Sequence, residues 1–233
     1  MLRVGLSTLP VLPVTRAWLS WSSGKDSAMA LHELRAAGDV EVVGLLTTLN
    51  ASAQRVAMHA VRRELLEAQA AAVGLPVHVV ELPWPCSNEA YEALMAEAVQ
   101  VAVGQGVESM AFGDLFLEDV RAYRERKLEG TGITPLFPLW QRPTHELAAE
   151  IVARGIRAVL TCVDPAQAPG ELAGRWYDAD LLASLPTAVD PCGERGEFHT
   201  FVVDSPEFAA PLSVEVGQVV ERDGFVFADV VPT

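Results

Sequence analysis

Ser22-Ser23-Gly24-Lys25-Asp26-Ser27 lies between an apolar run at residues 17–21 and a second apolar run at residues 28–31. This order predicts a strand, a tight loop of small residues and a helix. Small residues let the backbone approach an anion, and the first N–H groups of the helix point toward that anion at the positive end of the helix dipole. Lys25 adds a full positive charge. The stretch therefore predicts a phosphate-binding loop near the start of an α/β fold.

The composition limits the partners of the chain. At 233 residues, half of them hydrophobic, it is long enough for one large domain or for one domain with an appendage. The formal charge of −14 disfavours a long nucleic acid as partner, because such binding normally begins with a basic patch. Three cysteines without a C-x-x-C pair predict neither a disulfide framework nor a zinc ribbon. No apolar run reaches about 18 residues, so we expect no membrane span and a cytoplasmic protein.

The first fifteen residues follow neither a helical nor a strand period. Residues 2–14 are mostly apolar and include Pro10 and Pro13. A secretory signal is disfavoured, because Arg3 alone supplies a basic region and no clean small-residue cleavage site precedes the strand. We predict an N-terminal extension over residues 1–15.

Strands and helices are expected to alternate through the first half of the chain. The predicted helices span residues 27–37, 56–73 and 88–103, and the predicted strands span residues 40–46, 76–82 and 109–112. Such alternation indicates βαβ units and a parallel sheet with helices on both faces. Ligands of these sheets bind beyond the carboxyl ends of the strands. Asp114, directly after a predicted strand, should therefore lie at the same edge as the loop.

The second half has a different pattern. We place a boundary near residue 137, where Pro135, Pro138 and Pro143 interrupt an aromatic stretch. Helices are expected at residues 146–153 and 178–185, and strands at 157–163, 198–203, 212–220 and 225–231. The last two strands form a hairpin through Glu221-Arg222-Asp223-Gly224. These patterns predict a nucleotide-binding domain at 16–137 and a smaller α+β, substrate-binding domain at 138–233. Whether the hairpin packs on the core or on a second subunit in a homodimer stays open.

The residue after Lys25 separates two kinds of phosphate loop. A Walker A loop, G-x-x-x-x-G-K-S/T, has a hydroxyl residue there, whereas this chain has Asp26. The loop instead resembles the PP-loop of ATP pyrophosphatases, which grips the pyrophosphate that leaves as a substrate is adenylated. The second position of that loop is usually Gly, and here it is Ser23. A plain Ser- and Gly-rich turn with a helix cap is the alternative.

Two later segments narrow the resemblance. Residues 113–125, followed by 135–140, look like the central motif of the diphthine–ammonia ligase-like family, and residues 192–204 look like its closing G-E-x-G-E-F/Y-x-T signature. The three motifs occur in order over most of the chain. The resemblance implies a modified HUP-type Rossmann fold that uses ATP, releases AMP and pyrophosphate, and amidates a carboxylate with ammonia.

The chemistry of such a reaction assigns roles to the loop. A carboxylate that attacks the α-phosphate needs positive charge on the leaving pyrophosphate and a divalent metal ion on the phosphate oxygens. We predict that residues 22–27 bind ATP and that Lys25 is catalytic. Asp26 and Asp114 are the candidate Mg²⁺ ligands, since that ion prefers a few carboxylates together with phosphate oxygens. Thr47 and Asn50 follow the carboxyl end of a strand, at the height where adenine or ribose would bind.

Three charged residues would share one face of a helix after Asp114. Glu118, Arg121 and Arg124 are spaced by three residues. Arg121 is predicted to be catalytic, because a guanidinium group holds a carboxylate or a phosphate through two nitrogens. Glu118 and Arg124 are predicted to contact the substrate. A solvated row of surface ion pairs is the alternative.

The closing motif gathers ionisable groups around Gly193 and Gly196. Glu194 and Glu197 are predicted to position ammonium and to remove its proton, since free ammonia is scarce at neutral pH. His199 and His59 are predicted to contact the substrate. A plain hairpin with exposed acids, and histidines that face solvent, are the alternatives.

These features favour an ATP-dependent, AMP-forming carboxylate–ammonia ligase. Its substrates would be ATP with Mg²⁺, ammonia, and a carboxylate on a small molecule or on a modified protein side chain. One alternative is a PP-loop sulfurtransferase that modifies tRNA through Cys162 or Cys192, which the charge of −14 disfavours. A non-catalytic nucleotide-binding module is the other, and the several polar motifs argue against it. The sequence does not identify the carboxylate.

Overall fold

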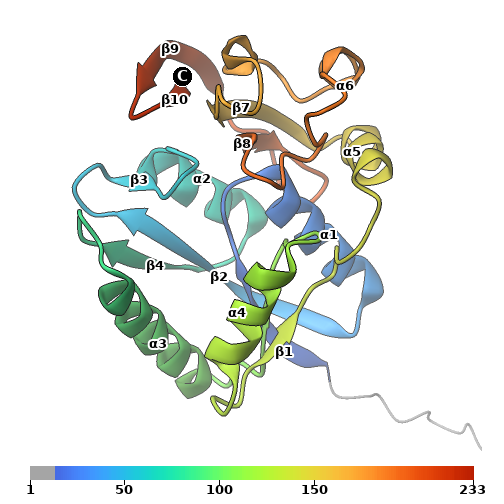
Figure 1. Cartoon of the computed structure of the whole chain (residues 1–233). Coiled ribbons are helices and arrows are strands. Elements are labelled where there is room, and N and C mark those ends of the chain that lie inside the picture. Colours follow the sequence, from blue (N-terminus) through green and yellow to red (C-terminus); the bar gives the residue numbers. More distant parts are fainter. Residues whose placement is uncertain (1–13) are drawn as a thin grey trace, which may run out of the picture.

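A computed structural model describes residues 14–233 of the chain (Figure 1). The extension predicted for residues 1–15 therefore lies almost entirely outside the described residues.

The first sheet is parallel except for one short strand. Its order is β3-β2-β1-β5-β6, with β4 paired to the far half of β2. The strands are β1 (Thr15–Ser20), β2 (Val40–Asn50), β3 (Arg55–Val56), β4 (Val77–Leu82), β5 (Ser109–Ala111) and β6 (Thr134–Leu136). Among these six strands, β3 alone runs antiparallel to its neighbour. Chain order reverses between β1 and β5, and ligands of open α/β sheets bind at such a point.

Helices cover both faces of this sheet, as expected. The helices are α1 (Lys25–Ala37), α2 (Arg63–Val73), α3 (Asn88–Gly104) and α4 (Glu118–Leu128). One apolar cluster packs α1 and α2 on the first face, and a second cluster packs α3 and α4 on the other. Gly38 and Gly74, at φ of +73° and +75°, end α1 and α2 in the left-handed conformation that glycine favours.

The second half forms an antiparallel sheet of order β8-β7-β10-β9. Its elements are α5 (Thr144–Ala153), β7 (Arg157–Val163), the short 3₁₀ helix η1 (Gly170–Leu172), α6 (Ala179–Ser184), β8 (Phe198–Asp204), β9 (Val214–Arg222) and β10 (Phe225–Pro232). Asp223 and Gly224, at φ of +53° and +84°, turn β9 into β10. Positive φ at both positions gives the twist that a two-residue hairpin needs. The predicted fold class, including the terminal hairpin, is confirmed.

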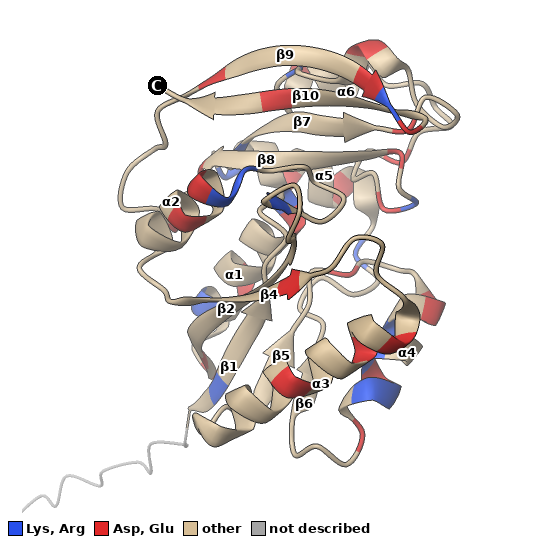
Figure 2. Ribbon diagram, turned by 90° about the vertical axis from the view of Figure 1, so that its left-hand side faces the viewer, with Lys and Arg blue, Asp and Glu red and all other residues tan. Residues whose placement is uncertain are grey.

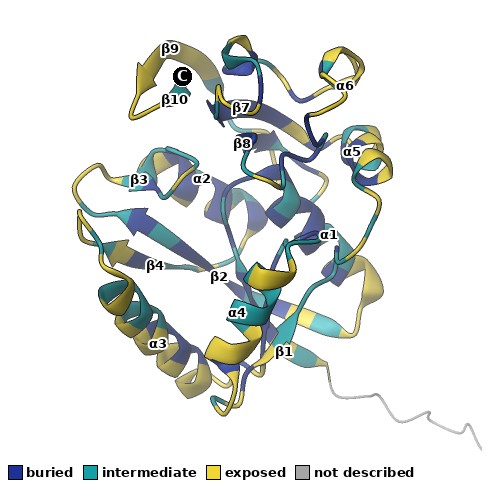
Figure 3. Cartoon of the chain, viewed as in Figure 1, coloured by how far each residue is buried: buried dark blue, intermediate teal, exposed yellow. Residues whose placement is uncertain are grey.

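The two halves share one core. The second sheet lies beyond α1 and α2, so the layers run from this sheet through α1 and α2 to the first sheet and then to α3 and α4 (Figure 2). Buried residues continue from the first sheet into the second (Figure 3). Backbone hydrogen bonds also cross between the halves, from Val202 to the Ser23 carbonyl and from Ala209 to the Ala72 carbonyl. The predicted phosphate loop of residues 22–27 therefore lies where the two halves meet.

The prediction of one long helix over residues 56–73 is wrong, because α2 begins only at Arg63. Val56 pairs with Leu49 of β2, and the N–H of Ala57 donates to the Thr48 carbonyl. The backbone that would form the first helical turns is thus bonded to a strand. Met58 and Ala60 adopt left-handed φ values of +62° and +55°, which a helix does not allow.

Candidate active site

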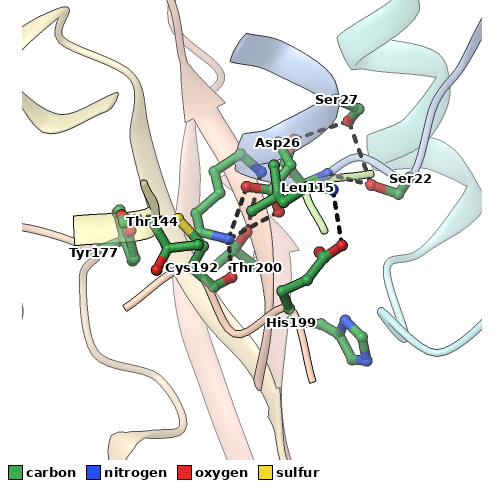
Figure 4. A network of polar contacts seen from close by, with 12 residues as sticks. Ser22, Asp26, Ser27, Leu115, Thr144, Tyr177, Cys192, His199 and Thr200 are labelled. Atoms are coloured by element: carbon green, nitrogen blue, oxygen red, sulfur yellow. Dashed lines mark hydrogen bonds and ion pairs between the residues drawn. The ribbon is translucent and has the colours of Figure 1, made fainter. Parts of the chain in front are cut away.

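The loop of residues 22–27 joins β1 to α1 beside the end of β5. Ser22 donates to the hydroxyl of Ser27 over 3.3 Å, and Ser27 donates to the Gly24 carbonyl over 2.8 Å (Figure 4). A Cβ atom on Gly24 would lie 3.2 Å from the Nε2 atom of His59 and from the Thr200 carbonyl oxygen. A Cβ atom on Gly113 would lie 3.1 Å from the Asp26 backbone. Glycine at both positions lets the surrounding segments close around the loop.

Ser23 adopts the conformation that glycine favours. Its φ is +69°, its side chain is fully buried, and its hydroxyl has no hydrogen-bond partner among the described residues. Ser23 thus keeps the backbone conformation that a glycine would adopt at this position, and it adds a buried hydroxyl group.

Lys25 is a buried cation at the base of the loop. Its Nζ atom lies 2.9 Å from an Asp26 carboxylate oxygen and also donates to the Cys192 carbonyl. The rings of Tyr177 and Phe198 lie 5.4 and 5.5 Å from it. Burial opposes the charge on Lys25, but Asp26, Cys192 and Glu194 together outweigh burial and raise the pKa of the ammonium group. The lysine is thus held charged, in contact with the closing motif.

Asp114 and Arg124 form an ion pair at the end of β5. The guanidinium group donates twice to the carboxylate, over 2.5 and 3.0 Å, and lies 4.3 Å from the centre of the Phe112 ring. Asp114 and Arg124, whose opposite charges neutralise each other, line the same cavity as Lys25. A metal ion or an anion that enters would have to compete with this pairing.

Glu194 faces the cavity from the closing motif. It accepts a hydrogen bond of 2.8 Å from the backbone N–H of Leu115, which links the two later motifs (Figure 4). Burial raises the pKa of Glu194 to about 7, and the charges of Asp26 and Asp114 act in the same direction. A carboxyl group with such a pKa exchanges protons near neutral pH.

Glu197 is turned away from the cavity. It is 2% exposed, and its carboxylate accepts from the backbone N–H groups of Asp190 and Arg195 over 3.0 and 2.9 Å. The side chain thereby holds the loop that carries Glu194. Its place in the structure is that of a support for the closing motif.

His59 and His199 lie against each other at the cavity wall. Their ring centres are 4.6 Å apart, and they come from the segment before α2 and from β8. Burial lowers the pKa of His199 to about 4 and that of His59 well below its usual range. Both imidazoles are therefore neutral at pH 7 and can accept hydrogen bonds from a substrate.

Two residues predicted to meet the nucleotide lie elsewhere. Thr47 is buried and donates to the Trp21 carbonyl over 2.7 Å. The Asn50 side chain accepts from the N–H groups of Ser52 and Ala53, at the edge of a second, separate cavity of about 530 Å³. The structure does not bring these residues to the cavity of Lys25.

Glu118 and Arg121 also lie outside that cavity, beside a shallow cavity with Trp140. Arg121 pairs with Glu125 over 2.8 Å, and its guanidinium group stacks 4.8 Å from the rings of Phe137 and Trp140. Of the helical triplet, only Arg124 reaches the candidate active site.

Sequence reasoning missed two groups that contact the loop. The Thr200 hydroxyl accepts from the Lys25 backbone N–H over 3.1 Å, and Gln69 of α2 donates to the Ser23 carbonyl over 3.1 Å. Thr200 belongs to the closing motif, so its presence there was a usable signal. Gln69 is a single amide in an Ala- and Leu-rich helix, and nothing local marks it.

The cavity between these groups measures about 270 Å³. Its lining comprises Ser20, Ser22, Lys25, Asp26, Ser27, His59, Gly113, Asp114, Leu117, Arg124, Cys192, Gly193, Glu194, Gly196, Phe198, His199 and Thr200. Residues 14–233 contain no cluster of three or more His, Cys, Asp or Glu side chains that would hold a metal ion alone. The carboxylates of Asp26 and Asp114, beside the predicted phosphate loop, still fit Mg²⁺, which takes its remaining ligands from phosphates and water.

The cysteines do not fit sulfur transfer. Burial raises the pKa of both Cys162 and Cys192 to about 12, so neither thiol is ionised at neutral pH. Over the part of the chain that the structure describes, no helix is both long and apolar enough to cross a membrane.

Comparison with known proteins identifies relatives of both halves. Residues 15–135 match the model of the diphthamide synthase N-terminal domain, and residues 143–227 match that of the C-terminal domain. The diphthine–ammonia ligase of Rattus norvegicus is 28% identical over 150 residues, which cover 62% of this chain and 56% of the rat protein. The diphthine–ammonia ligase of Homo sapiens is 25% identical over 231 residues, 90% of this chain and 86% of the human protein.

Proposed function

Because the chain belongs to the diphthamide synthase family, we propose that it is an ATP-dependent ligase that adenylates a carboxylate and then joins it to ammonia. One observation carries the proposal. A single cavity beside the switch point of the parallel sheet is lined by the phosphate loop, by Asp26 and Asp114, and by Glu194. These are the groups that pyrophosphate release and amide formation require.

ATP would bind with its β- and γ-phosphates on residues 22–27. Lys25 neutralises charge on the leaving pyrophosphate, and the positive end of the α1 dipole acts on the same anion. Gly24 precedes α1 and has no side chain to cap the helix, which leaves room for a phosphate there. Mg²⁺, when bound by Asp26 and Asp114, supplies further positive charge to the phosphate oxygens.

The reaction then has two displacements. A carboxylate oxygen of the acceptor attacks the α-phosphorus of ATP, the bond to the bridging oxygen breaks, and pyrophosphate leaves with that electron pair. Ammonia next attacks the acyl carbon, and AMP leaves with the carboxylate oxygen. Glu194 takes the proton that nitrogen must lose, because its pKa near 7 suits proton transfer at neutral pH.

The remaining groups of the cavity would position the acceptor. His59 and His199 offer neutral nitrogen atoms, and Arg124 offers a guanidinium group once Asp114 turns to the metal ion. The acceptor is a carboxylate, and the names of the relatives indicate diphthine. In this proposal residues 16–137 bind the nucleotide and residues 138–233 bind the acceptor. A cytoplasmic location and a homodimer stay predictions.

The proposal is tested by the products of ATP turnover. The protein is incubated with ATP, Mg²⁺, ammonium and a panel of carboxylates that includes diphthine on its carrier protein. We expect AMP and pyrophosphate in an amount equal to the amide formed. Lys25→Ala should abolish this turnover, whereas Arg121→Ala should leave most of it. ADP with inorganic phosphate would contradict adenylation.

A further inference from the structure

Gln69 connects the phosphate loop to three segments of the fold. It lies on α2, is completely buried, and uses both ends of its amide. Its Oε1 atom accepts from the Trp21 indole N–H over 2.9 Å. Its Nε2 atom donates to the carbonyls of Ser23 and Val202 over 3.1 and 2.6 Å. One side chain thus joins the end of β1, the loop and β8.

The chemistry of its neighbours allows only one orientation of this amide. The indole N–H is purely a donor, and the two carbonyls are purely acceptors. A rotated amide would place NH₂ against the indole N–H and oxygen against two oxygens. Of the side chains that could stand at position 69, only one that ends in a primary amide offers an acceptor for the indole and two N–H donors for the carbonyls. The arrangement therefore requires glutamine specifically.

The bond to the Ser23 carbonyl acts at the strained point of the loop. Ser23 holds a φ of +69°, and its carbonyl also accepts from the Val202 N–H over 2.9 Å. Left-handed backbone at a non-glycine residue persists where the surroundings hold it. Gly24 follows as the N-cap of α1, and Lys25 and Asp26, the first two residues of that helix, line the cavity.

We propose that Gln69 is the positioning residue of the pyrophosphate site, fixing the Ser23 peptide so that the loop is shaped for phosphate before ATP arrives. The inference rests on the proposed function. Gln69 touches no substrate in this account and acts through the loop. Loss of the Gln69 side chain should therefore raise the dissociation constants of phosphate ligands while the protein still folds.

Calorimetry tests this role by measuring the dissociation constants of ATP and of pyrophosphate, each in the presence of Mg²⁺. Gln69→Leu removes all three hydrogen bonds and should raise both constants about tenfold, the size expected when the bonds that shape a site are lost. Val73→Ala is the matched control. Val73 is buried one turn further along α2, so this variant loosens the same helix without touching the loop. It should change both constants less than twofold.

Gln69→Glu supplies a readout that a purely structural role would not produce. A neutral carboxyl group can donate to one of the two carbonyls, whereas a carboxylate repels both. Burial raises the pKa of such a group, so the neutral form persists at low pH. The ATP dissociation constant of Gln69→Glu relative to wild type should therefore rise between pH 6 and pH 8. This ratio keeps the test valid if Gln69→Leu fails to fold.

The outcomes separate this inference from the proposed function. Unchanged dissociation constants in Gln69→Leu, or a flat ratio for Gln69→Glu, would overturn the positioning role and leave the ligase proposal standing. If the variants lose phosphate binding as expected but the wild-type protein forms ADP, the positioning role stands and the adenylation proposal falls. A wild-type protein that binds neither ATP nor pyrophosphate would overturn both.

Discussion

Ser23 shows how a single residue can carry a local cost inside a functional loop. Left-handed φ costs an L-residue about 1 kcal/mol, and a buried hydroxyl with no partner within residues 14–233 adds to that cost. Glycine would adopt the same backbone without strain and would remove the hydroxyl.

We therefore predict that Ser23→Gly raises the free energy of unfolding by about 1 kcal/mol, measured by urea denaturation. Met58→Gly is the control. Met58 has a similar φ of +62° but is exposed, so this variant relieves backbone strain alone and should gain less. A Ser23→Gly variant less stable than wild type would mean that the hydroxyl contributes to the fold.

Glu194 gives a prediction about pH. Its pKa of about 7 means that the carboxylate, which acts as the base, is the minor form below that pH and the major form above it. The rate of amide formation at saturating ATP should therefore rise as pH increases through about 7. Glu194→Gln should lower the rate about a hundredfold and remove this limb of the profile. A variant that keeps the same limb would exclude Glu194 as its source.

At the scale of elements, the closing motif depends on its glycines for different reasons. Gly193 has a φ of +68°, and a Cβ atom there would lie only 2.7 Å from the Phe198 carbonyl oxygen. Gly196 has a φ of +90° but would meet nothing closer than 3.9 Å. The first position combines strain with a backbone collision, whereas the second carries strain alone.

Gly193→Ala should accordingly lower the free energy of unfolding by about 3 kcal/mol, and Gly196→Ala by about 1 kcal/mol. Thermal and urea unfolding of the two variants measure the difference. Equal losses would show that the loop moves to relieve the collision. Because Glu194 lies between these glycines, activity should follow the same order.

For the whole molecule, Asp229 joins the second half to β3 and to the start of α2 in the first half. This residue of β10 accepts from Arg62 over 2.6 Å and from Arg55 over 2.9 Å. Burial opposes its charge, but these hydrogen bonds outweigh burial and lower the pKa of Asp229 to about 2. The group therefore stabilises the fold above its ordinary pKa of 3.8, and this stabilisation is lost as pH falls toward 2.

Asp229→Asn should cost about 2 kcal/mol of unfolding free energy at pH 7. The difference between wild type and variant should shrink as pH is lowered from 5 to 2. Denaturant unfolding at several pH values measures it, with Asp223→Asn as a control on the exposed hairpin turn. A difference that does not change with pH would mean that the ion pairs contribute nothing to the coupling of the halves.

Local patterns were enough to predict the fold class and the strand, loop and helix around residues 22–27. Each useful pattern determines the structure of only a few neighbouring residues. These patterns are the small residues between two apolar runs, the glycines after helices, and Asp223-Gly224 between two strands. The start of α2 was predicted too early, because residues 56 and 57 pair with β2. This pairing is a long-range contact that a local sequence pattern does not reveal. Glu194 and Glu197 are three residues apart, but their side chains point in different directions because they accept from the N–H groups of Leu115 and Asp190. No local sequence pattern predicts where those N–H groups lie.

In the proposed reaction, the acceptor carboxylate becomes bonded to the α-phosphorus of ATP. The most direct measurement uses an acceptor labelled with ¹⁸O in its carboxylate, and the products are analysed by mass spectrometry after amide formation. We predict one ¹⁸O atom in the phosphate of each AMP released. Label found in inorganic phosphate, or AMP without label, would contradict the adenylation mechanism.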